Sequence, residues 1–258
     1  MRGSGSTGGA GFVIVAVLRT AATTLILSLY ILIAGPPTLL WTILTRNARV
    51  MYAAGALGLR IGLGLAGIRV DVKGAEHIPA GRSAVYAANH SSNVEPPAVF
   101  FALRRLFPHL RVLYKAELRK LPVLVWVFDA AGFVAIERAN REQSFPAVDR
   151  AADALRTGAS FLIFPEGTRS RTGELLPFKK GGFIMAINAQ VPVVPVAVSG
   201  GRAAMRKGSP LIWPATVTVR IEPPVETTGL SIDARDRLVA GVRGSIARAL
   251  GDAGAASP

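Results

Sequence analysis

The sequence predicts an α/β domain with a central mixed sheet flanked by helices, preceded by an N-terminal membrane-associated hairpin of two helices. From Ile68 onward, short β-rich segments alternate with helical patterns, as in folds built around a central sheet. The preceding residues 11–67 hold much of the apolar excess of a chain that is 50% hydrophobic. We expect the hairpin over 11–67, the α/β domain over 68–251, a flexible tail over 1–10 and a frayed tail over 252–258.

The chain is strongly basic as well as apolar. Its 258 residues include 30 Lys and Arg against 16 Asp and Glu, a formal net charge of +14. Such a balance indicates contact with a polyanion, either nucleic acid or an anionic membrane surface. Aromatic residues are only 7% and lie scattered through apolar segments, whereas nucleic-acid binders gather basic and stacking aromatic residues on one surface. We therefore expect anionic membrane lipids, and no nucleic acid, as partners.

The composition also excludes several kinds of site. Because the chain has no cysteine, it forms no disulfide, thiolate zinc site, iron–sulfur cluster or cysteine nucleophile. Its three histidines (His77, His90 and His109) leave little room for a metal site, and we predict none. No G-x-S-x-G motif occurs, which disfavours a serine hydrolase.

The first expected element is an apolar helix from Gly11 to Gly35 whose one charge is Arg19. A signal peptide has a similar basic start and apolar middle, but the apolar stretch is long and no cleavage site follows it, which favours a retained membrane helix. The uncharged part, residues 20–34, would rise only about 22 Å, short of the roughly 30 Å hydrocarbon core.

A second helix is expected over residues 38–66, after the proline pair at 36–37. Its Arg46, Arg49 and Arg60 fall within about 60° of one another on a helical wheel, which gives one basic stripe. We interpret the two helices as a hairpin dipped into one leaflet, with this stripe toward phosphate headgroups. A membrane-spanning first helix and a buried soluble helical pair are the alternatives.

One glycine motif in this region resembles a nucleotide site. Residues 62–67 match G-x-G-x-x-G, but that fingerprint needs a strand before it and a helix after it. Here a helix precedes and a strand follows, so we reject the nucleotide interpretation. We expect Gly58 and Gly62 to let two helices approach closely instead.

Seven strands and five helices are expected after residue 67. The strands are residues 68–72, 83–88, 111–114, 133–136, 160–164, 193–198 and 216–222. The helices are residues 96–106, 121–130, 141–156, 182–190 and 232–250, the last stopped by Gly251.

The segment after the second strand suits acid–base chemistry. His90 stands where the strand ends, and Glu95 lies in the first turn of a helix for which Ser92 or Asn93 is a fit N-cap. A carboxylate five residues after an imidazole can fold back onto it, fix its tautomer and make the other nitrogen a better base. The pair therefore predicts a general base for a substrate hydroxyl. The alternative is a histidine that merely caps the strand beside a solvated glutamate.

The fifth strand runs into a second polar segment. Gly167 permits a tight bend that exposes backbone N–H groups, Thr168 adds a hydroxyl and Arg169 a planar fork. Lys179 and Lys180 keep this rim positive. The segment predicts a cradle for a phosphomonoester, and an ordinary strand-end turn is the alternative.

These segments resemble, in order, the motifs of the glycerolipid acyltransferase family. His90–Glu95 resembles its H-x4-D motif and Phe164–Arg169 its F-P-E-G-T-R motif. The other similar blocks are Lys115–Leu118 (K-x-E-L), Gly132–Arg138 (G-x-x-x-[IV]-[DE]-R), Phe178–Gly181 (F-K-x-G) and Val191–Pro195 (V-P-V-x-P).

The resemblance implies transfer of an acyl chain from acyl-CoA or acyl-carrier protein to the sn-2 hydroxyl of lysophosphatidic acid (1-acyl-sn-glycerol 3-phosphate), giving phosphatidic acid without another cofactor. It implies a catalytic set of His90 as general base, Glu95 orienting it and Lys115 stabilising the oxyanion. The substrate-binding residues that it implies are Arg138, Phe164, Pro165, Glu166, Gly167, Thr168 and Arg169. It also implies association with the cytoplasmic face of a bacterial inner membrane.

The chain departs from the family pattern at two positions. The motif usually carries Asp where this chain has Glu95, whose extra methylene moves the carboxylate by about 1 Å or slightly more. Val125 stands where a glycine usually precedes the Trp. The departures leave open the same transfer onto another lysophospholipid or an amino-acid-derived lyso-lipid. A non-catalytic basic membrane-binding protein is the alternative from another class.

Overall fold

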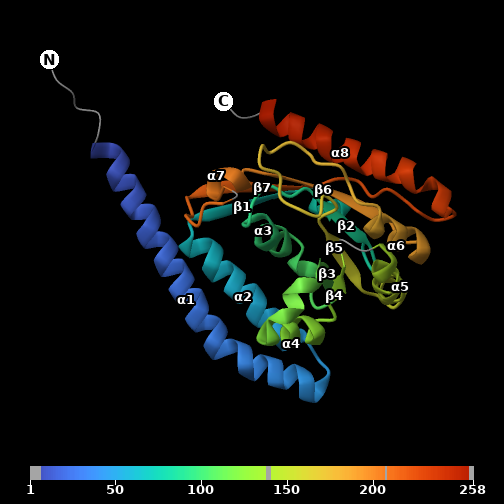
Figure 1. The fold of residues 1–258 in the computed structure, drawn as a ribbon, viewed down its shortest axis with the longest axis horizontal. Coiled ribbons are helices and arrows are strands. Elements are labelled where there is room, and N and C mark those ends of the chain that lie inside the picture. Colours follow the sequence, from blue (N-terminus) through green and yellow to red (C-terminus); the bar gives the residue numbers. More distant parts are fainter. Residues whose placement is uncertain (1–6, 138–140, 207, 256–258) are drawn as a thin grey trace.

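A computed structural model describes residues 7–137, 141–206 and 208–255. Figure 1 shows two parts: a long helical hairpin, drawn in blue, and an α/β domain that packs against its second helix. The hairpin consists of α1 (Thr7–Thr45) and α2 (Arg49–Leu65). This arrangement confirms the expected fold class.

The hairpin turns ten residues later than the proline pair suggested. Helix α1 continues through Pro36 and Pro37, and Figure 1 shows its axis changing direction in the half that contains them. Each proline removes one intrahelical hydrogen bond, but the hydroxyl of the following Thr38 donates to the carbonyl of Ala34 at 2.7 Å. The expectation that a second helix starts at residue 38 is therefore wrong.

The turn itself consists of residues 46–48. Arg46 has a left-handed φ of 53°, and the amide of Arg49 donates to the Asn47 side chain at 3.0 Å, which stabilises the turn before α2. Because Arg46 lies in the turn, the expected stripe of three arginines on one helix is wrong. Arg49 and Arg60 remain together on an exposed face of α2.

Helix α1 presents its apolar side chains to the surroundings. Gly11–Thr45 is long and apolar enough to cross a membrane, the one such helix in the described ranges. Phe12, Leu32 and Ile33 are each at least 70% exposed. The burial that the alternative of a buried, soluble helical pair requires is therefore not found in α1.

Two glycines of α2 bring the hairpin helices together. A Cβ on Gly58 would lie 2.9 Å from the Tyr30 ring, and a Cβ on Gly62 would lie 2.9 Å from the Leu27 side chain. The Tyr30 hydroxyl also donates to the carbonyl of Ala54 at 2.7 Å. The expected role of Gly58 and Gly62 in close helix approach is confirmed.

The domain is built on one seven-stranded mixed sheet of order β1-β7-β6-β2-β5-β3-β4. The strands are β1 (Ile68–Lys73), β2 (Val85–Ala88), β3 (Leu110–Lys115), β4 (Val134–Ile136), β5 (Ser160–Ile163), β6 (Val193–Ser199) and β7 (Ala215–Ile221). All neighbours are parallel except β6 and β7. Every expected strand is thus confirmed, within a few residues at its ends.

Helices cover both faces of the sheet. They are α3 (Glu95–Ala102), α4 (Pro122–Ala130), α5 (Arg141–Arg156), α6 (Gly181–Ala189), α7 (Gly201–Ala204) and α8 (Arg235–Ala255). Short 3₁₀ turns lie at Ala75–His77, Arg104–Leu106, Ala116–Lys120 and Ile232–Ala234. Helix α7 was not expected, and α8 continues past Gly251, so the expected stop at that glycine is wrong.

The buried strand β2 shows why the sheet has two cores. Its Val85 and Ala87 face a core shared with α5, α6 and α8, while Tyr86 and Ala88 face a core shared with α3. Figure 1 shows these helix groups on opposite sides of the sheet. With both faces covered, the edge where the parallel strands end is left for ligands.

Two side-chain hydrogen bonds fasten the hairpin to the domain. The Tyr52 hydroxyl of α2 donates to the carbonyl of Leu110 in β3 at 2.5 Å. The amide of Ile212, in the loop before β7, donates to the Thr20 hydroxyl of α1 at 2.9 Å. Both hairpin helices therefore have fixed positions relative to the sheet.

The close helix contact at Gly62 predicts that a larger side chain at this position destabilises the protein, whereas one at Gly64 does not. Gly62→Val should destabilise the protein by about 1–3 kcal/mol, because the added side chain overlaps Leu27. Gly64→Val is the matched control, since a Cβ there meets nothing within 4 Å. Thermal unfolding in detergent measures both. Equal unfolding temperatures for the two variants would contradict the close approach.

Candidate active site

The sheet topology gathers the polar segments at one edge. Strand β2 pairs in parallel with β5, and β5 pairs in parallel with β3, so their carboxyl ends share one edge of the sheet. His90 follows β2, Phe164 follows β5, and Lys115 ends β3. Ligands bind at this edge in open α/β sheets, so segments far apart in the chain form one candidate site.

His90 and Glu95 form a hydrogen-bonded pair. The Nδ1 atom of His90 lies 3.1 Å from Oε2 of Glu95. The Glu95 side chain is fully buried, whereas that of His90 is 17% exposed. The alternative of a solvated glutamate beside a strand cap is therefore wrong.

The Glu95 carboxylate is also held by the loop it belongs to. Its Oε2 accepts the amides of Ser91 at 2.5 Å and Ser92 at 2.9 Å. Its Oε1 accepts the hydroxyl of Ser91 at 2.5 Å. A carboxylate held by such donors can accept a further hydrogen bond from an N–H at Nδ1 of His90. In that tautomer of the imidazole, Nε2 carries the lone pair and is the basic atom.

Two neighbours fix this loop to strand β6 and to the segment after α7. The side-chain amide of Asn89 donates to the carbonyl of Val198 at 2.9 Å and accepts its N–H at 2.7 Å. The Ser92 hydroxyl donates to the carbonyl of Met205 at 2.6 Å. Helix α3 begins without a side-chain cap after Val94, so the expected N-cap is wrong.

Phe164 and Pro165 lie beside the imidazole. The Phe164 ring is 4.6 Å from the His90 ring, tilted by 36°, and limits its rotation. The carbonyl of Pro165 accepts the amide of Lys179 at 2.8 Å, which closes the loop that contains the phosphate motif.

Glu166 braces the backbone of His90. It is 4% exposed, and its Oε1 accepts the His90 amide at 2.6 Å while its Oε2 accepts the Leu176 amide at 3.0 Å. The carbonyl of His90 in turn accepts the amide of Ser170 at 2.8 Å. Burial raises the pKa of Glu166 above its ordinary value, and the two amide donors oppose that rise. The contacts support a bracing role, and contact with substrate stays a prediction.

Gly167, Thr168 and Arg169 form the tip of this loop. Gly167 has a φ of 69°, and a Cβ there would lie 2.9 Å from Cε of Lys179, so both conformation and space favour glycine. Thr168 is exposed. The Arg169 guanidinium donates to the side chain of Asn93. The loop thus places a hydroxyl and a guanidinium on the side of the protein that holds His90.

Two predicted site residues remain to be placed, Lys115 and Arg138. Lys115 is half exposed at the end of β3, and its Nζ lies 2.8 Å from Oε1 of Glu117. No hydrogen bond or ion pair joins Lys115 to His90 or Glu95 in the described parts of the chain. Arg138 lies outside the described residues.

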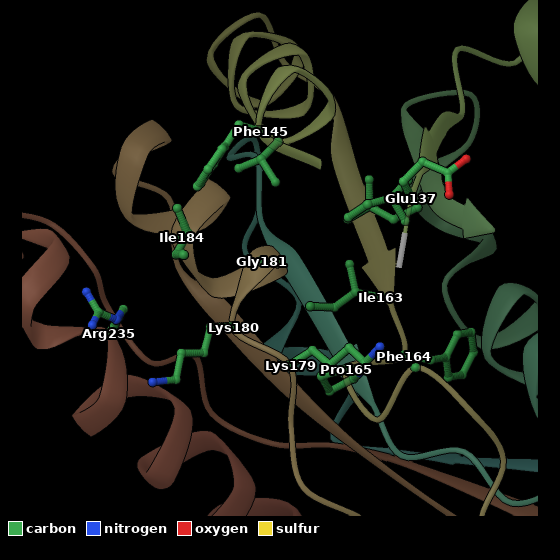
Figure 2. Close-up of a pocket in the computed structure, with 15 residues that line it drawn as sticks. Glu137, Phe145, Ile163, Phe164, Pro165, Lys179, Lys180, Gly181, Ile184 and Arg235 are labelled. Carbon is green, nitrogen blue, oxygen red and sulfur yellow. The ribbon is translucent and has the colours of Figure 1, made fainter. Parts of the chain in front are cut away.

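A cavity of about 490 Å³ adjoins this edge. Its apolar lining consists of Leu113, Ile136, Phe145, Val148, Ile163 and Ile184, and its cationic lining of Lys179, Lys180 and Arg235. Figure 2 shows Phe145 of α5 and Ile184 of α6 facing the same space, with Lys180 and Arg235 toward α8. Phe164 both lines the cavity and contacts the His90 ring, so one side chain separates the cavity from the imidazole.

Sequence reasoning missed the residues that hold the pair in place. Asn89 and Ser91 flank His90 in the chain, and their position at a strand end was the available signal. Gly201 leaves space beside Glu95 because it has no side chain. In the sequence it cannot be told apart from the adjacent Gly200, which is glycine for a different reason.

Comparisons with known proteins give a consistent result. The acyltransferase family matches residues 69–199. A 1-acyl-sn-glycerol-3-phosphate acyltransferase of Cocos nucifera is 31% identical over 224 residues, covering 83% of this chain and 69% of its own. The crystal structure of the 1-acyl-sn-glycerophosphate acyltransferase of Thermotoga maritima is similar with a TM-score of 0.77 at 28% identity, covering 95% of this chain and 98% of its own.

The chain matches only part of the length of its plant relatives from Limnanthes. The 1-acyl-sn-glycerol-3-phosphate acyltransferase of Limnanthes douglasii is 34% identical over 175 residues, which is 67% of this chain. The match covers 60% of that relative and 61% of its counterpart from Limnanthes alba, so the chain spans about three fifths of the length of these curated relatives.

The bracing contacts of Glu166 predict a loss of stability on amidation. Glu166→Gln should destabilise the protein by about 1–3 kcal/mol, because the amide nitrogen would face a buried backbone N–H. Glu174→Gln, an exposed residue of the same loop, is the control. The unfolding temperatures of the two variants are compared. A Glu166→Gln protein that is as stable as the Glu174→Gln control would exclude the bracing role.

Proposed function

Because the chain belongs to the acyltransferase family, we propose that it moves an acyl chain from a thioester to the sn-2 hydroxyl of 1-acyl-sn-glycerol 3-phosphate, giving phosphatidic acid. The thioester is acyl-CoA or acyl-carrier protein. The observation that carries the proposal is the His90–Glu95 pair, buried on its carboxylate side and open on its imidazole side. This arrangement suits a base that acts on a substrate hydroxyl and needs no protein nucleophile.

The proposed reaction is a direct transfer. Nε2 of His90 takes the proton of the acceptor hydroxyl as its oxygen attacks the thioester carbon. The tetrahedral intermediate then expels the thiolate, which takes the proton back from His90. Glu95 stabilises the imidazolium formed between the two steps, because its carboxylate lies 3.1 Å from Nδ1. General-base assistance of this kind contributes about 10²–10⁴ in rate.

Lys115 is proposed to stabilise the oxyanion of the tetrahedral intermediate. Its position at the end of β3, one strand beyond β5, supports this role. The ammonium group must exchange its partner Glu117, 2.8 Å away, for the developing negative charge. Since both side chains of this ion pair are about half exposed, the exchange costs little.

The phosphate of the acceptor is proposed to bind at the Phe164–Arg169 loop. Thr168 and Arg169 supply a hydroxyl and a guanidinium, Lys179 lies against Gly167, and Arg138 is expected to join them. Arg–phosphate pairs bind with two parallel hydrogen bonds, which orients the ligand as well as holding it. Phosphate at this loop would direct the glycerol hydroxyl toward His90.

The cavity beside Phe164 is proposed to hold an acyl chain. Its volume of about 490 Å³ is typical of a site for a small ligand, and its interior is aliphatic and aromatic. Its three cationic residues, Lys179, Lys180 and Arg235, outnumber the lining carboxylate of Glu137, which suits the anionic end of a lipid. Val125 and Trp126 do not line this cavity, so the departure at Val125 leaves its described walls unchanged.

Membrane association is proposed to occur through α1. Many of its apolar side chains are exposed in the described structure and match a hydrocarbon environment. Arg49 and Arg60 on α2 would meet anionic headgroups, each contributing about 1 kcal/mol. The cytoplasmic face of a bacterial inner membrane is the proposed location.

The function is tested with a panel of acceptors and a histidine variant. Purified protein in detergent should consume acyl thioester with 1-acyl-sn-glycerol 3-phosphate, and His90→Ala should lower that rate by about 10²–10⁴. His109→Ala, an exposed histidine away from the pair, is the control and should retain activity. Chromatography of the lipid products follows the reaction.

The acceptor panel also includes 1-acylglycerol, lysophosphatidylcholine and an amino-acid-derived lyso-lipid. Phosphatidic acid as the main product supports the proposed acceptor. Faster acylation of one of the other lipids, or full activity of the His90→Ala protein, would contradict the proposal.

A further inference from the structure

Gly201 lies against the carboxylate of Glu95. It is buried at the start of α7, directly after β6 and so at the same edge of the sheet as His90. A Cβ on Gly201 would lie 2.8 Å from Cγ and 2.8 Å from Oε1 of Glu95, and 3.1 Å from Cβ of Ser92. Real Cβ atoms are not found as close as 2.8 Å to other heavy atoms, so any larger residue here would displace Glu95.

The two adjacent glycines are needed for different reasons. Gly200 has a φ of 81°, and a Cβ there would lie 2.1 Å from the carbonyl oxygen of Thr216, so its own backbone demands glycine. Gly201 has no left-handed φ, and its backbone would accept an L residue. The space that Glu95 occupies is therefore what restricts position 201.

Glu95 cannot yield this space without losing its hydrogen bonds. The carboxylate is held by the amides of Ser91 and Ser92, by the Ser91 hydroxyl and by His90. Cγ, one of the two atoms nearest the missing side chain, is the methylene by which glutamate is longer than aspartate. The glycine thus accommodates the extra methylene.

We propose that Gly201 is a positioning residue that makes room for a glutamate in the His90–Glu95 pair, so that positions 95 and 201 work as a matched couple. The proposal rests on the proposed function, in which Glu95 orients the base. In this proposal, residues 95 and 201 together set the distance between the carboxylate and the imidazole. The efficiency of the base depends on that distance. A shorter acid at position 95 would leave space for a larger residue at position 201.

The couple is tested with four proteins: wild type, Gly201→Ala, Glu95→Asp and the double variant. Alanine at 201 should lower kcat by about tenfold to a hundredfold when residue 95 is Glu, because it misplaces the carboxylate. The acceptor KM should change little. With Asp at 95, the same alanine should leave kcat unchanged or raise it. Gly241→Ala, in α8 with nothing within 4 Å of its Cβ, is the matched control and should resemble wild type.

Two readouts need no substrate and separate this proposal from the proposed function. Nitrogen-15 NMR of the three histidines reports whether Nδ1 of His90 carries the proton. Thermal unfolding reports the fit of the couple. Gly201→Ala should lower the Nδ1–H population and the unfolding temperature, and Glu95→Asp should restore both in the double variant. If the variants show these effects but the wild type makes no phosphatidic acid, the proposed function alone is contradicted.

The proposal is overturned if alanine at 201 has the same effect on kcat and on the His90 spectrum with Glu or Asp at position 95, or no effect with Glu. If Gly201→Ala fails to fold, a folded double variant still supports the couple, and an unfolded double variant overturns it.

Discussion

The fully buried carboxylate of Glu95 is the constraint on which the site depends. Burying an ionised group costs several kcal/mol unless hydrogen-bond donors surround it. Here the loop that follows β2 supplies two amides and a hydroxyl, and His90 supplies the fourth donor. In the conformation that the loop adopts, all four donors reach the carboxylate and the imidazole is held beside it. The same interaction therefore stabilises the loop and orients the base.

The mixed sheet supplies supports on both sides of this loop. Strand β2 lies between β5 and β6. From the β5 side, Glu166 accepts the amide of His90, and from the β6 side, Val198 pairs with the side chain of Asn89. Two buried carboxylates thus hold one short segment: the Glu166 side chain accepts the backbone amide of His90, and the Glu95 side chain accepts both backbone and side-chain donors of residues 90–92. The hairpin is fastened to the same domain at Leu110 and Ile212, so the apolar surface of α1 has a defined position relative to the base.

Local interactions were predictable from the sequence, and interactions between distant segments were less so. Strand alternation predicted all seven strands, and the five-residue spacing predicted the His90–Glu95 contact because both residues lie in one turn. The hairpin turn was misplaced, since a proline pair was treated as a helix end whereas Thr38 supports the helix there. The sequence does not show that the Glu166 side chain accepts the His90 amide, because the two residues lie 76 positions apart in the chain. The importance of Gly201 depends on what lies beside it, which only the folded chain shows.

The central claim is that Glu95 acts through His90. A double-mutant cycle on the rate of acyl transfer tests it most directly, with His90→Ala, Glu95→Gln and the double variant compared with wild type. The account predicts that the double variant is no slower than His90→Ala alone, because without the imidazole the carboxylate has nothing to orient. Losses that multiply in the double variant would show that the two residues act independently, and would contradict the account.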